Sequence, residues 1–192
     1  MHRLIRIADG IDRVNAAIGR AAAWCVLAMV VVQFLVVLLR YVFSIGSVWL
    51  TESILYAHGT LFLLTAAWTL AAGGHVRVDI FYAGASPRHK AWIDLLGAVV
   101  LLLPFMLAVL VLSLPYVGRA WATLERSREA SGLPLVFILK TLIPIFAILL
   151  AAQGIAQAIR AWLTLFPSSL PGVTGRSSKF LDAPPSPGMT SG

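Results

Sequence analysis

The segment 21–39, AAAWCVLAMVVVQFLVVLL, decides the fold class of this chain of 192 residues. It contains no charged side chain and lies between Arg20 and Arg40. Its length is close to the roughly 20 apolar residues that a membrane-spanning helix needs. The run exceeds the about 7–15 apolar residues of a secretory signal peptide, and no small-x-small cleavage site follows it. We therefore expect a transmembrane helix here rather than a cleaved leader.

Three further apolar segments follow, at about 48–72, 92–117 and 133–163. Over the whole chain 59% of residues are hydrophobic and 12% are charged, whereas a soluble domain carries about 25% charged residues. Too few polar residues are available to cover a soluble core. The predicted fold class is an all-α integral membrane protein, with four transmembrane helices in a domain that covers 21–165.

The basic residues between these segments predict the orientation of the chain. One side receives ten of them: Arg3, Arg6, Arg13, Arg20, Arg77, Arg88, Lys90, Arg160, Arg176 and Lys179. The other side receives Arg40, Arg119, Arg126 and Arg128. By the positive-inside rule, both termini are predicted to be cytoplasmic in a multi-pass membrane protein. The same clustering explains the net charge of +7 without a nucleic-acid partner, so membrane lipids are the expected surroundings.

All six tryptophans lie near the predicted ends of spans. They are Trp24, Trp49, Trp68, Trp92, Trp121 and Trp162. Tryptophan is enriched at the headgroup level of both leaflets. We therefore interpret the six as an aromatic belt, which supports the span boundaries.

Residues 1–20 are predicted to form an amphipathic arm in the cytoplasmic interface. Its apolar side chains recur at helical spacing: Leu4, Ile7, Ile11, Val14 and Ile18. Gly10 and Gly19 favour a break before the first span, and the alternative is an N-terminal extension of that span. At the other end, residues 166–192 are rich in Pro, Ser and Gly and are predicted to be a disordered cytoplasmic tail.

Serine and proline mark the starts of the last two helices. Ser86 followed by Pro87 is a favourable N-cap and first helical position. The helix that starts there is predicted to be long and tilted, with a kink at Pro104. Pro134 predicts the start of the fourth helix, and Pro144 a kink within it.

Ionisable side chains inside a span are costly and therefore mark candidate functional residues. Glu52 has two interpretations: a favourable charge near a helix N-terminus, or an ion pair with Lys140 at similar depth. Lys140 alternatively extends to the headgroups. Gln33 and His58 lie deeper, and we expect each to hydrogen-bond a backbone or side-chain group of a neighbouring helix. The alternative is a role in binding a substrate or in moving a proton.

The segment 73–79, GGHVRVD, follows the second span. Its two glycines are expected to end the helix. A metal site at His75, Arg77 and Asp79 is rejected, because no second cluster supplies ligands and the guanidinium would repel the ion. Cys25 is the only cysteine, and neither GxSxG, HExxH nor a P-loop occurs. We therefore expect no enzyme activity, no cofactor and no metal.

Three motifs resemble the small membrane subunit of the TRAP (tripartite ATP-independent periplasmic) transporters, the DctQ-like family. The first is RYVF at 40–43, followed by Trp49 and Glu52. The second is GHVRVD at 74–79, and the third is SGLP at 131–134 with Pro144 ten residues beyond it. The resemblance covers about residues 1–165. Two departures are Ser53, where many members have a second acidic residue, and Lys140, which is typical of one branch.

The resemblance implies a non-catalytic scaffold subunit of a sodium-driven importer of organic acids, located in the bacterial inner membrane. It implies two partners: a large permease subunit that holds the substrate and sodium sites, and a periplasmic solute-binding protein. The candidate interface residues are Arg40, Glu52, His75, Arg77, Asp79, Arg126, Arg128 and Lys140. The charged loop around Arg126 and Arg128 either docks the binding protein or is simply solvated. Two alternative functions stay open: a membrane anchor of a redox or haem complex, and a self-sufficient homodimeric small transporter.

Overall fold

The structure is a computed structural model that describes residues 2–74, 84 and 86–166. Its helices are α1 (His2–Val42), α2 (Val48–Ala71), α4 (Pro87–Leu96), the π-helical segment η1 (Gly97–Leu102), α5 (Leu103–Ala122) and α6 (Val136–Leu165). Since α4, η1 and α5 are continuous, four helices are long and apolar enough to cross a membrane. The predicted fold class, all helical with four candidate spans, is therefore confirmed. His75, Arg77, Asp79 and the tail beyond Phe166 lie outside the described residues.

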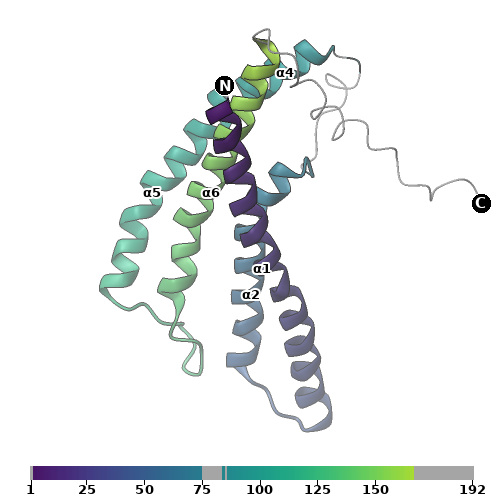
Figure 1. Cartoon of the computed structure of the whole chain (residues 1–192). Helices are drawn as coiled ribbons and strands as arrows, with labels where there is room; N and C mark the ends of the chain where they lie inside the picture. The colour runs from purple at the N-terminus through teal and green to yellow at the C-terminus, as the bar shows by residue number, and fades with distance from the viewer. Residues whose placement is uncertain (1, 75–83, 85, 167–192) are drawn as a thin grey trace, which may run out of the picture.

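The four long helices form two antiparallel pairs (Figure 1). In one pair α1 packs along α2, and in the other α5 packs along α6. Helix α6 also contacts α1, α2 and α4, so it is the central element of the bundle. The core lies where α2, α5 and α6 meet, around Ala67, Met106, Ala147 and Leu150.

Small side chains allow the helices to approach closely. Most of the buried apolar residues are alanines: Ala8, Ala22, Ala67, Ala91, Ala98, Ala120, Ala147, Ala156 and Ala161. Gly19 of α1 lies against the indole of Trp68, and a Cβ at this position would be 2.6 Å from the ring. Such small-residue interfaces are typical of membrane helices, where packing replaces the hydrophobic effect.

Helix α1 is one continuous helix of 41 residues, which corrects the prediction of a break at Gly10 or Gly19. The structure agrees with the alternative prediction, in which residues 1–20 extend the first span at its N-terminus. Gly19 provides the close contact with Trp68 rather than a break, and tertiary packing overrides the weak helix propensity of glycine. At 1.5 Å per residue α1 is about 60 Å long, about twice the thickness of the hydrocarbon core.

The predicted helix ends agree with the structure at several positions. Ser86 caps α4, where its Oγ accepts a hydrogen bond from the His89 amide at 3.3 Å. After α2 the chain turns at Gly73, which has a positive φ of 70°. The Gly74 amide donates to the Thr69 carbonyl at 2.9 Å, in a Schellman-type helix end.

The irregularity expected at Pro104 takes the form of the π-helical segment η1, which lies immediately before this proline. The Leu103 amide donates to the Ala98 carbonyl, five residues back. Proline lacks an amide hydrogen and its ring crowds the carbonyl four residues earlier. A wider π turn at this point accommodates both effects. Helix α6 begins at Val136, two residues after Pro134, and includes Pro144 as a buried residue.

Candidate functional site

Glu52 connects the start of α2 to the loop between α5 and α6. Ser47 caps α2 through the Leu50 amide, which places Glu52 in the second turn. The Glu52 carboxylate accepts hydrogen bonds from the Ser127 hydroxyl and, at 2.6 Å, from the Leu133 amide. We call Glu52, Ser127, Gly132 and Leu133 the loop cluster.

The backbone of the loop is folded around this carboxylate. The Ser127 amide donates to the Leu133 carbonyl at 3.2 Å, and the Gly132 amide donates to the Glu129 carbonyl at 3.0 Å. A Cβ on Gly132 would lie 2.7 Å from the Glu52 carboxylate, so this position needs glycine. The structure thus brings together two motifs of the resemblance, Trp49–Glu52 and the SGLP segment, which are far apart in the sequence.

Lys140 has a different partner from the one predicted. Its ammonium group donates to the Glu125 carboxylate at 2.5 Å and lies 4.1 Å above the centre of the Tyr116 ring. The predicted Glu52–Lys140 ion pair is therefore wrong, because each residue binds a different part of the same loop. A hydrogen bond between α5 and α6 lies next to this ion pair in the sequence: the Trp121 indole donates to the Thr141 hydroxyl at 2.9 Å. The loop is thus held by α2 on one side and by α6 on the other.

The remaining candidate residues of this region are exposed. Arg126 and Arg128 lie on the loop, and Arg40 lies in the last turn of α1. The cation at Arg40 is favourable there because it faces the negative end of the helix dipole. Among the described residues, none of these three guanidinium groups forms an ion pair. They are available for a partner, but their role stays a prediction.

The tryptophans divide into two groups. Trp24, Trp49, Trp92, Trp121 and Trp162 are between 42% and 72% exposed, as membrane-facing side chains would be. Trp68 instead packs between helices against Gly19. The belt interpretation therefore stays a prediction for five of them, and Trp68 also has a packing role.

A second polar cluster, which the sequence reasoning missed, joins α1 to α6. The Asn15 amide donates to Gln153 at 2.7 Å, and Gln153 donates to Asp12 at 2.8 Å. Arg160 then pairs with Asp12 at 2.5 Å and with Asp9 at 3.2 Å. Asn15 and Gln153 are almost fully buried, at 2% and 0% exposure. We call these five residues the α1–α6 cluster.

A signal for this cluster was present in the sequence. Asp9, Asp12 and Asn15 follow one another at intervals of three residues, which places them on one face of a helix. Gln153 and Arg160 are seven residues apart, and therefore also share a face. Because residues 1–20 were assigned to a separate interfacial arm, the two polar faces were not matched.

Gln33 and His58 form no hydrogen bond to another helix among the described residues of this chain, in contrast to the prediction. Both side chains are exposed. The His58 ring stacks on Phe62, with ring centres 6.4 Å apart. Within the described residues neither side chain has a hydrogen bond, because each points out of the bundle rather than towards a neighbouring helix.

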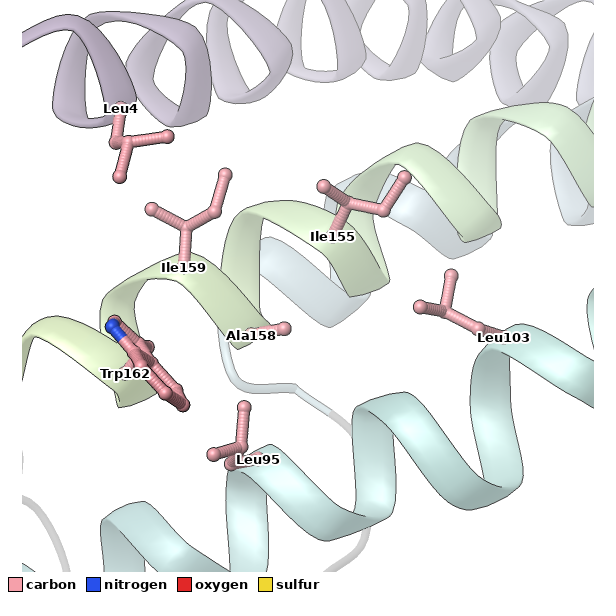
Figure 2. A pocket seen from close by; sticks show the side chains of 7 residues that line it. All are labelled: Leu4, Leu95, Leu103, Ile155, Ala158, Ile159 and Trp162. Carbon is pink, nitrogen blue, oxygen red and sulfur yellow. The ribbon is translucent and has the colours of Figure 1, made fainter. Parts of the chain in front are cut away.

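An apolar groove of about 300 Å³ lies between the N-terminal turn of α1, α4, the start of α5 and the C-terminal half of α6 (Figure 2). Its lining consists of Leu4, Leu95, Leu103, Ile155, Ala158, Ile159 and Trp162. The Trp162 indole is the only side chain of this lining that carries a polar atom. No group of three or more potential metal ligands occurs among the described residues.

Comparison with known proteins returned one family. The family model described as "Tripartite ATP-independent periplasmic transporters, DctQ component" matches residues 29–164, well over half of the chain. The matched stretch begins within α1 and ends one residue before the end of α6, so it includes the loop cluster. Searches of the curated proteins and of the solved structures gave no match.

Proposed function

This chain belongs to the DctQ-component family of the tripartite ATP-independent periplasmic transporters, and from this membership we propose that it is the non-catalytic scaffold subunit of such a transporter. In the proposed complex it binds a large permease subunit in the inner membrane, with both termini in the cytoplasm. The complex imports organic acids with sodium, and a periplasmic solute-binding protein delivers the solute.

The main support for the scaffold role is that the polar side chains of both clusters bind other groups of the same chain. In the loop cluster, Glu52 is occupied by a serine hydroxyl and a backbone amide. In the α1–α6 cluster, the amide and carboxylate side chains bind one another and Arg160. A solute site needs polar groups that converge on an open cavity. Both clusters instead hold parts of the chain together.

The apolar groove supports the same conclusion. An organic acid needs cations or several hydrogen-bond donors around its carboxylate. The surface of the groove is entirely apolar, and the one polar atom among its lining side chains, the Trp162 indole nitrogen, contributes nothing to that surface (Figure 2). This groove is therefore unsuited to a carboxylate, which supports our proposal that the selective site belongs to the partner subunit.

The outer surface of the bundle is suited to a partner or to lipid. In the most apolar window of each candidate span, at most 22% of the residues are buried within the chain. Exposed large side chains extend along whole helices, for example Val30, Phe34, Phe105 and Leu112. Such surfaces are stable in the membrane and suit a subunit that widens a larger assembly.

The proposal is tested by purifying the tagged chain in mild detergent after coexpression with the large permease subunit. We expect the two chains to elute together and sodium-dependent uptake in proteoliposomes to require both. Uptake by this chain alone would support the self-sufficient transporter instead. Haem absorbance in the purified chain would support the redox anchor.

Docking of the solute-binding protein on the α5–α6 loop is tested by reversing two exposed charges. The double variant Arg126→Glu/Arg128→Glu should reduce uptake while the membrane complex still assembles, because these guanidinium groups form no ion pair within the described residues. The matched control reverses two arginines at the other end of the bundle, Arg3→Glu/Arg6→Glu. Unchanged uptake in the loop variant would show that the loop is only solvated.

A further inference from the structure

Helix α2 has one narrow exposed face. After its first two residues, the exposed positions are Thr51, Leu55, His58 and Phe62, and they follow one another at intervals of four, three and four residues. The other residues of α2 are buried or half-buried, because α1 and α6 pack on its flanks. We call these four residues the α2 stripe.

The spacing of the α2 stripe suits another helix. Residues repeated at alternating intervals of three and four form a seam along which a second helix packs its side chains into holes. Leu55 and Phe62 are 60% and 66% exposed, so large apolar side chains lie on both sides of His58. The Thr51 hydroxyl already donates to the Ser47 carbonyl at 3.1 Å within its own helix. His58 is therefore the member of the stripe that still needs a polar partner.

The position of His58 argues against lipid as its neighbour. It lies ten residues after Val48, about 15 Å along the helix, which is near the middle of a hydrocarbon core about 30 Å thick. The imidazole is too short to reach either headgroup region from there. Acyl chains offer no hydrogen bond to its ring nitrogens, and such polar groups within spans almost always face protein or water. Within the described residues the ring of His58 stacks on Phe62, and this contact leaves both imidazole nitrogens without a hydrogen bond.

We propose that one transmembrane helix of the large permease subunit packs against the α2 stripe, and that this helix presents a hydrogen-bonding group to His58. The proposal rests on the scaffold function proposed above and specifies the helix face through which it acts. The α2 stripe then forms the seam of the interface, with Leu55 and Phe62 as its apolar contacts.

The test places a photo-crosslinking amino acid at Leu55 or at Phe62 in the full chain, coexpressed with the tagged large subunit in native membranes. The control position is Leu112 on α5, which is 74% exposed and apolar but lies on a different helix. We expect an adduct of one copy of each subunit from both stripe positions and a weaker adduct from Leu112. A stronger adduct from Leu112, an adduct between two copies of this chain, or lipid adducts alone would overturn the proposal. In each of these cases, complex recovered by co-purification would leave the scaffold function intact.

His58 itself is tested by substitution. His58→Leu should lower the association constant between this chain and the large subunit in detergent by about 3- to 15-fold. This is the range expected for the loss of one interhelical hydrogen bond in a membrane. His58→Gln should restore part of the loss, because it keeps a donor and an acceptor. Size-exclusion profiles of the variants without the partner show whether each still folds. If His58→Leu binds as tightly as the wild type, the hydrogen bond to this residue does not exist.

Discussion

Replacing Glu52 by alanine should release the loop between α5 and α6 while leaving the four helices in place. The carboxylate is the shared acceptor for the Ser127 hydroxyl and the Leu133 amide, and these two residues are the two ends of the folded part of the loop. Without it, both donors lose their protein partner. Each contact between α5 and α6 away from the loop is unaffected.

The size of the effect follows from the two hydrogen bonds. A hydrogen bond to a charged group contributes about 1.5–3 kcal/mol, and leaving a buried donor unpaired costs about 1–3 kcal/mol. Glu52 and Ser127 are only partly buried, so water compensates for some of this loss, whereas Leu133 is buried. We expect the free energy of loop opening to fall by about 2–3 kcal/mol, which corresponds to a roughly 30- to 150-fold larger open population.

Trypsin provides the assay, because Arg126 and Arg128 lie within the loop. Cleavage requires the loop to open, so its rate follows the open population when opening and closing are fast. Thr51→Ala is the matched control: it removes a hydroxyl beside Glu52 that bonds only within α2, and should change the rate less than about twofold. Equal cleavage rates for Glu52→Ala and the wild type would refute the role assigned to the carboxylate.

Two further predictions concern the contacts of α1. Gly19→Ala should lower the free energy of unfolding of the detergent-solubilised chain by about 1–3 kcal/mol, because the new Cβ would overlap Trp68. Gly10→Ala should be neutral or stabilising, because there is open space around Gly10. Equal effects of the two substitutions would argue against the close contact. A double-mutant cycle of Asp12→Asn and Arg160→Met should give a coupling of about 0.5–1 kcal/mol, since both side chains are about one-third exposed or more. Strict additivity in unfolding measurements would show that this ion pair contributes nothing.

The helices and several of their ends could be predicted because the relevant signals are local. An apolar run of sufficient length specifies a span, whatever lies beside it. Ser86 and Pro87 mark a helix start, and Gly73 and Gly74 mark a helix end, through interactions within a few residues. Gly10 and Gly19 were misinterpreted, since a glycine inside a continuous helix can have the same local sequence as one that ends a helix.

The contacts of the candidate site were harder to predict because they are made between distant segments. A carboxylate in the second turn of a helix has the same local pattern whether it meets Lys140 or a backbone amide. The partner of Glu52 is the Leu133 amide, a group that every residue except proline carries. Gly132 was the useful signal, because the close approach of Glu52 excludes any larger residue there.

The loop cluster also has a consequence for the order of synthesis. Glu52 is separated by 75 and 81 residues from its two partners, Ser127 and Leu133. Helix α2 ends at Ala71, so at a synthesis rate of about 5–20 residues per second the first hairpin of α1 and α2 is complete roughly 3–12 s before the ribosome has made the residues that bind this carboxylate. During this interval the nascent hairpin carries an acidic group without its final ligands. The arrival of the second hairpin satisfies that group, so the hydrogen bonds between Glu52 and the loop form late and join the two hairpins.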